Sequence, residues 1–105
     1  MDIHNINDFM GGWFIGNFQP AVLNTDEFEV CYKKHHKGEK WDAHYHAKAL
    51  EINCLISGRM MIQGVELGAG TIFVIKPFEV ADPVFLEDCE VLVVKTPSVP
   101  NDKYI

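Results

Sequence analysis

The amino-acid sequence predicts an all-β protein with one hydrophobic core. Short apolar runs recur along its 105 residues with glycine or proline between them, which is the pattern of strands and turns. No stretch combines helical periodicity with capping residues, except for one turn near residues 7–10. Hydrophobic residues make up 48% of the chain, so a packed fold is expected rather than disorder. Strands at this spacing in about 100 residues favour a β-sandwich or a small barrel.

The N-terminal part of the chain contains two strand signals. Residues 13–15 are an aromatic and β-branched run between two glycine-containing turns. Residues 28–32 alternate apolar and polar side chains, which is the period of a half-buried strand. Residues 1–26 are expected to be an arm with one strand, docked on the barrel or on a dimer partner.

Five further strands are expected, at residues 51–56, 60–62, 65–67, 71–75 and 91–94. The first ends at a Ser-Gly pair and is expected to form a hairpin with the second, while a Gln-Gly turn separates the second from the third. The last two are continuous apolar runs, which suit strands buried between two sheets. The barrel core is therefore expected over residues 27–95.

Residues 96–105 form a tail that cannot be a central strand, because Pro97 and Pro100 lack the N–H group that a strand ladder needs. The tail is a loose end, an arm docked on the barrel, or an arm packed across a neighbouring subunit. Both ends of the chain could cover sheet edges, which so small a sandwich leaves open. We therefore expect a homodimer.

The charge and the cysteine content of the chain limit its expected binding partners and cellular compartment. The net charge of −6 argues against a nucleic-acid partner. Acidic residues dilute a run of lysines, so a solvated strand edge is expected there rather than an anion site; the run comprises Lys33, Lys34, Lys37 and Lys40. Three cysteines cannot all pair, and reduced thiols of a cytoplasmic protein are expected. The sequence shows no signal peptide and no run of about 20 apolar residues, so no membrane partner is expected.

The most informative stretch runs from Gly38 to Gly58 and contains His44, His46 and Glu51. On a β-strand the two histidines would project from the same side, because side chains alternate between faces. A short turn after His46 would start a second strand and bring the Glu51 carboxylate to that side. Two imidazoles and one carboxylate form a three-ligand set for a divalent transition metal, with Fe, Mn, Ni, Co and Zn all compatible.

Neighbouring residues extend this site. Asn53 and Leu55 share the face of Glu51, so both are expected to line the pocket, with Asn53 orienting the carboxylate. His35 and His36 lie on the preceding strand. Either one of them faces inward, as in a regular strand, or both are a solvated pair at the strand end.

This stretch resembles the first motif of the cupin superfamily. That motif has a glycine, five residues, His-x-His, three or four residues, a glutamate, six residues and a second glycine. Gly38, His44, His46, Glu51 and Gly58 match it without a spacing error. The resemblance implies a double-stranded β-helix, also called a jelly roll, with the metal ligands inside the barrel near one mouth.

The second cupin motif is incomplete. Gly70 and Pro77 follow its outline, but its later glycine is missing, and so is the histidine that usually supplies a fourth ligand. The position of that histidine falls on Ala81 or Asp82. Asp82 is therefore either an oxygen ligand or a surface aspartate before Pro83, and the sequence leaves both readings open.

The resemblance implies a small metal-dependent cupin that binds a small oxygen-rich or carboxylate ligand. If it is an enzyme, dioxygenase, isomerase or lyase chemistry is implied. The sequence has no nucleophile elbow and no phosphate-binding loop, so no catalytic residue and no cofactor other than the metal is assigned. A non-catalytic metal- or metabolite-binding module and a metal-free structural dimer are the alternatives.

Overall fold

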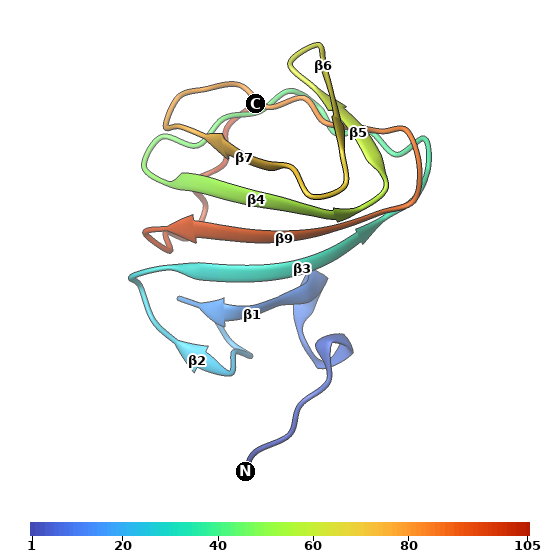
Figure 1. The fold of residues 1–105 in the computed structure, drawn as a ribbon. Coiled ribbons are helices and arrows are strands. Elements are labelled where there is room, and N and C mark those ends of the chain that lie inside the picture. The colour runs from blue at the N-terminus through green and yellow to red at the C-terminus, as the bar shows by residue number, and fades with distance from the viewer.

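The computed structural model describes residues 1–105 as nine strands and two 3-10 helices (Figure 1). The strands are β1 (Trp13–Gly16), β2 (Leu23–Asn24), β3 (Glu29–His35), β4 (Leu50–Ser57), β5 (Arg59–Ile62), β6 (Val65–Gly68), β7 (Ile72–Ile75), β8 (Val84–Phe85) and β9 (Cys89–Thr96). The helices, η1 (Ile6–Asp8) and η2 (Met10–Gly12), have three residues each. Neither of them could cross a lipid bilayer.

The strands form two sheets whose inner faces share the core. The larger sheet has the order β2-β1-β3-β9-β4-β7, and the smaller sheet has the order β6-β5-β8. All neighbours are antiparallel except β1 and β2. The long strands β3, β9 and β4 lie side by side in the middle of the larger sheet (Figure 1). This architecture confirms the predicted all-β class.

A strand is present at each of the seven predicted positions, but the predicted hairpin between residues 51–56 and 60–62 is wrong. Strand β5 pairs with β6 and β8, and not with β4. Gly58 lies between the two strands with a φ of +89°, and a Cβ atom there would lie only 2.3 Å from the Asp88 carbonyl oxygen. Glycine alone tolerates this tight corner, at which the chain leaves one sheet for the other.

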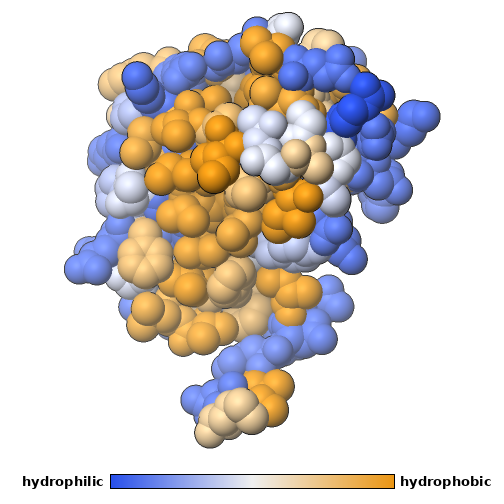
Figure 2. Space-filling view, in the orientation of Figure 1, coloured by the Kyte–Doolittle hydropathy of each residue, from blue (hydrophilic) through white to orange (hydrophobic).

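The two continuous apolar runs were expected to be buried on both faces, and they are not. In β7, Ile75 is 5% exposed, whereas Ile72 and Val74 are 66% and 43% exposed. Ile52 and Ile56 of the neighbouring β4 are also exposed. These four residues form an apolar outer face on the larger sheet, and Figure 2 shows apolar side chains gathered over this side of the molecule.

Inward side chains of both sheets form one hydrophobic core. Its largest fully buried side chains are Leu55 of β4, Met60 of β5, Cys31 and Cys89. All three cysteines are free thiols. The remaining members of the core are Ile62, Ile75, Ala81, Phe85, Val91 and Val93.

The C-terminal tail packs against its own chain, which is the expected arrangement in which it docks on the barrel. The Asp102 carboxylate accepts hydrogen bonds from the backbone N–H groups of residues 47–49, at 3.0 Å each. Two residues further on, Tyr104 forms a backbone bridge with Tyr45, and the two rings stack with centroids 5.3 Å apart. The tail thereby holds the segment that leads into β4.

Candidate functional site

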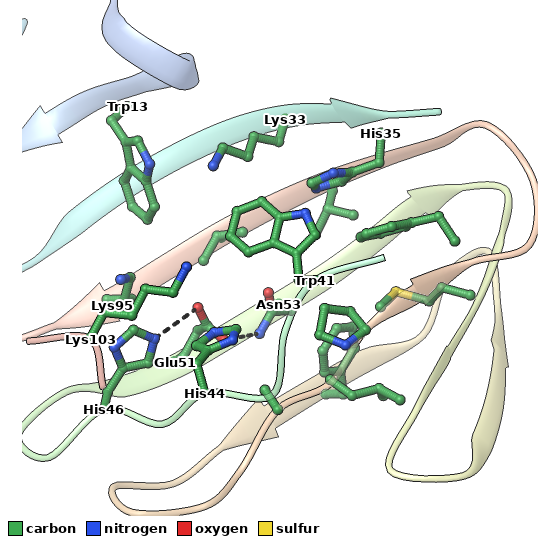
Figure 3. A pocket seen from close by; sticks show the side chains of 18 residues that line it. Trp13, Lys33, His35, Trp41, His44, His46, Glu51, Asn53, Lys95 and Lys103 are labelled. Atoms are coloured by element: carbon green, nitrogen blue, oxygen red, sulfur yellow. Dashed lines mark hydrogen bonds and ion pairs between the residues drawn. The ribbon is translucent and has the colours of Figure 1, made fainter. Parts of the chain in front are cut away.

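A cavity of about 300 Å³ opens at one end of the barrel. Its walls come from β1, β3, β4, β7 and β9 of the larger sheet, from β5 and β8 of the smaller sheet, from the segments before β4 and before β8, and from the tail. Figure 3 shows His44, His46, Glu51 and Asn53 directed into this cavity. The structure therefore brings four of the predicted site residues to one place.

The segment that carries the two histidines is not a regular strand. Only isolated bridges hold it, from His44 to Ala81 and from Tyr45 to Tyr104. The alternation of side chains is nevertheless kept, so His44 and His46 are both buried and their ring centroids lie 5.5 Å apart. The expected turn after His46 is present, and β4 begins at Leu50.

Backbone carbonyl groups determine which nitrogen of each imidazole is free. Nδ1 of His44 lies 3.0 Å from the Asp42 carbonyl oxygen, and Nδ1 of His46 lies 2.5 Å from the Asp102 carbonyl oxygen. A carbonyl oxygen can only accept, so each Nδ1 carries a proton, and in the neutral form of either imidazole the free lone pair is on Nε2. Burial, and next the positive charge of Lys95, lowers the pKa of His46 and favours its neutral form. Neutral imidazoles with a free Nε2 are the form that binds metals.

Glu51 projects from β4 beside the two histidines. Its Oε1 lies 3.9 Å from Nε2 of His46, and its Oε2 accepts a hydrogen bond from the Asn53 side-chain amide at 3.3 Å (Figure 3). Two donor atoms that each bind one transition metal at about 2.0–2.2 Å can be at most about 4.4 Å apart. The separation of 3.9 Å lies within this limit, so His46 and Glu51 are close enough for small side-chain movements to bring both atoms to one ion, and Asn53 orients the carboxylate.

The site is not fully assembled. No group of three or more His, Cys, Asp or Glu side chains has its donor atoms arranged around a common point. His44 lines the same cavity, but no contact of its ring with Glu51 is present. Metal binding at this site stays a prediction.

Two predicted residues lie elsewhere. Asp82 is exposed, and its Oδ1 accepts a hydrogen bond from the backbone N–H of Gln63 at 2.8 Å. The buried Ala81, which forms the bridge to His44, lines the cavity instead, so of the two positions on which the second-motif histidine could fall, the one in the cavity carries a methyl group. Leu55 is fully buried in the core beyond the cavity and does not line it.

His35 lines the cavity, whereas the sequence left open whether it faces inward or is solvated. It is buried and stacks on Phe85 at a centroid distance of 3.9 Å, while His36 is exposed. Nδ1 of His35 lies 2.5 Å from Oε2 of Glu39, which also accepts a hydrogen bond from the Trp41 indole at 2.9 Å. A carboxylate that holds one imidazole nitrogen in this way leaves Nε2 to accept or release a proton.

The lysine run is not a purely solvated edge. Lys34, Lys37 and Lys40 are exposed, but Lys33 lines the cavity together with Lys95 and Lys103. Alternation along β3 could have revealed Lys33, because it shares a face with Cys31 and His35, both of which are buried. No local signal pointed to Lys95 or Lys103, which reach the cavity from distant parts of the chain.

Comparison with known proteins finds similarity in structure alone. No protein-family model and no curated protein sequence matches the chain. An uncharacterized conserved protein with a double-stranded β-helix domain from Klebsiella pneumoniae matches with a TM-score of 0.71 at 22% identity, over 98% of this chain and 89% of that chain. The DMSP lyase DddQ from Ruegeria pomeroyi matches with a TM-score of 0.73 at 15% identity, over 89% of this chain and 49% of the lyase.

A cupin-2 domain-containing protein from Shewanella frigidimarina matches with a TM-score of 0.59 at 18% identity, over 71% of this chain and 76% of that chain. At such identities the likeness concerns the fold and does not extend to activity. The order of strands and these likenesses agree with the expectation from the first motif: the protein has the double-stranded β-helix fold of small cupins.

Proposed function

We propose that the protein binds a divalent transition metal ion through His44, His46 and Glu51 and uses it to capture a small oxygen-rich or carboxylate ligand. One observation carries this proposal: both imidazoles donate from Nδ1 to backbone carbonyl groups, which leaves two Nε2 lone pairs in the cavity that holds the Glu51 carboxylate. Fe, Mn, Ni, Co and Zn all suit this donor set. A bound metal ion would act as a Lewis acid on an oxygen atom of the ligand.

The other residues of the cavity would select and position the ligand. A volume of about 300 Å³ is at the small end for ligand pockets, so the ligand has few heavy atoms. Asn53 keeps Glu51 in place through its hydrogen bond. His35, oriented by Glu39, would be the group that carries a proton if the protein is a dioxygenase, an isomerase or a lyase. A lyase of the same fold, DddQ, supports keeping lyase chemistry in this range.

The absence of a fourth ligand favours a second candidate, a non-catalytic module that binds a metal or a metabolite. Of the two positions on which the second-motif histidine could fall, Ala81 lines the cavity without a ligand atom and Asp82 is exposed, so a bound metal would have three protein ligands. In a third candidate, the metal-free dimer, His44, His46 and Glu51 would serve only as a buried polar cluster.

Elemental analysis of the purified protein tests the metal site. We expect about one equivalent of transition metal per chain, retained after dialysis. The double variant H44A/H46A should lose it, whereas H36A should retain it, because His36 is exposed and lies outside the cavity. Retention of metal by the double variant would contradict the ligand assignment, and a metal-free wild type would favour the structural dimer. Turnover of a panel of small carboxylates, set against a thermal shift without turnover, then separates the enzyme from the binding module.

We also propose that the protein is a homodimer formed through the apolar outer face of Ile52, Ile56, Ile72 and Val74. Exposed apolar side chains gathered on one sheet face mark an interaction surface, and a second copy of the same face is self-complementary. Light scattering should give twice the chain mass of 11.9 kDa. The variant I72K should give a monomer, and V65K, exposed on the smaller sheet, should not. A monomeric wild type would refute the proposal.

A further inference from the structure

Three lysine side chains converge on the cavity from separate elements. Lys33 comes from β3, Lys95 from β9 and Lys103 from the tail. Lys33 and Lys95 are half-buried, and Lys103 is exposed. Figure 3 shows them at the end of the cavity where Trp13 and His46 lie. The lysines therefore neighbour the proposed metal ligands.

The ammonium groups lie over aromatic rings. Nζ of Lys33 is 5.7 Å from the centre of the Trp13 ring and 4.8 Å from that of Trp41. Lys95 approaches Trp13 at 5.0 Å, and Lys103 approaches Trp41 at 4.6 Å. Cation–π contacts of this kind hold an ammonium group in place at an apolar wall without neutralising it.

No carboxylate forms an ion pair with these lysines. All four ion pairs in the structure involve His35, His46 or Arg59, so no lysine ammonium lies within 4.0 Å of a carboxylate oxygen. Glu29 on β3 and Glu51 on β4 are both register partners of Lys95, but neither forms an ion pair with it. Asp102 is next to Lys103 in the chain, but its carboxylate accepts hydrogen bonds from three backbone N–H groups.

The cavity is thus locally positive in an acidic protein. Three lysines and one carboxylate, Glu51, line it, although the chain as a whole carries a net charge of −6. Such a concentration of one sign of charge in a concave site attracts ions of the opposite sign. Unpaired cations held at a cavity wall are a binding site for an anion.

We propose that Lys33, Lys95 and Lys103 form a subsite for the carboxylate of a small organic acid, with Trp13 and Trp41 packing against its apolar body. Half of the 18 residues that line the cavity are hydrophobic, which favours an organic acid over an inorganic anion. This proposal rests on the proposed function, because it concerns the same cavity. It adds that the ligand of that cavity carries a carboxylate group. The lysine subsite itself forms without the metal.

Intrinsic fluorescence can test this subsite, because Trp13 and Trp41 are the only two tryptophans in the chain. Chelator-treated protein is titrated with benzoate, with its neutral analogue benzyl alcohol and with inorganic phosphate. We expect saturable binding of benzoate that weakens as salt is added, and at least about tenfold weaker binding of benzyl alcohol and of phosphate, which corresponds to about 1.4 kcal/mol. Equal affinity for benzoate and benzyl alcohol would overturn the proposal, and tighter binding of phosphate would replace the organic acid by an inorganic anion.

Single variants assign the lysines. K33M and K95M keep the length of the side chain and should each weaken benzoate binding about tenfold. K103M should also weaken benzoate binding. Because Lys103 is exposed, this variant does not disturb the core. K34M is the matched control, because Lys34 is exposed and lies on the opposite face of β3. Wild-type affinity in K33M, K95M and K103M would refute the subsite.

The double variant H44A/H46A separates this proposal from the metal site. If it binds benzoate and no metal, both proposals hold. If wild-type protein binds benzoate but contains no metal, the metal site fails and the lysine subsite stands. If wild-type protein contains metal but the lysine variants bind benzoate as tightly as wild type, the lysine subsite is refuted and the metal site is not.

Discussion

Replacing Asp102 by asparagine should destabilise the protein and loosen the segment between His46 and Glu51. The carboxylate accepts three backbone hydrogen bonds of 3.0 Å from residues 47–49. Burial by itself would raise the pKa of Asp102, but the hydrogen bonds from these N–H groups outweigh it and hold the pKa below its ordinary value. In the variant, one oxygen atom becomes an amide group that cannot accept. At least one N–H group then loses its partner.

The size of the effect follows from the kind of bond that is lost. A hydrogen bond to a charged group stabilises a protein by about 1.5–3 kcal/mol, and the two bonds that remain in D102N have a neutral acceptor. We expect a loss of about 2–3 kcal/mol at pH 7. A change of 1 kcal/mol shifts the Tm of a domain of this size by about 4–8 °C, so the Tm should fall by about 8–24 °C.

The effect should depend on pH with a definite sign. Because the pKa of Asp102 is lowered on folding, its carboxylate stabilises the folded state above the unfolded value of about 3.9. That contribution is lost as the pH falls through the folded pKa. The difference between wild type and D102N should therefore be complete at pH 7 and shrink below about pH 4.

Urea unfolding from pH 7 to pH 3 measures this difference. D88N is the control, because the exposed Asp88 accepts a single backbone hydrogen bond, from Lys37 at 2.8 Å, and should cost less than about 1 kcal/mol. A value for D102N within about 0.5 kcal/mol of wild type would refute the reasoning, as would a difference that stays the same throughout this pH range. Metal content of D102N should also fall, because the Asp102 carbonyl holds Nδ1 of His46.

Two further predictions concern the corner between the sheets and the buried thiols. G58A should lower the free energy of unfolding by more than about 2 kcal/mol, because φ is +89° at Gly58 and the new Cβ would lie 2.3 Å from a backbone oxygen. G68A is the control in the same unfolding assay, because its new Cβ would have no atom within 4 Å. Equal costs would contradict this account of the corner. Burial raises the pKa of Cys31 to about 11, so a thiol reagent at pH 8 should reach the buried Cys31 only on unfolding. Mass spectrometry showing early modification of Cys31 would exclude this.

Much of the local structure and part of the site could be predicted from the sequence. The alternation of residues 28–32 and the apolar runs marked strands that the structure contains, because side-chain periodicity is a local property of the backbone. The same rule placed His44, His46 and Glu51 on one side, and Asn53 beside Glu51. It also brought one of the two adjacent histidines, His35, into the cavity.

The tertiary structure decided which strands pair and which distant side chains meet. Backbone hydrogen bonds between strands depend little on side-chain identity, so residues 60–62 gave no sign that they join β6 and β8 rather than β4. A shift of one residue exchanges the two faces of a strand, and that choice put Ala81 in the cavity and Asp82 in solvent. Lys95 and Lys103 reach Trp13 and Trp41 only because β9 and the tail fold back along the cavity. Contacts between residues so far apart in the chain depend on the packing of the whole barrel, and no local pattern encodes them.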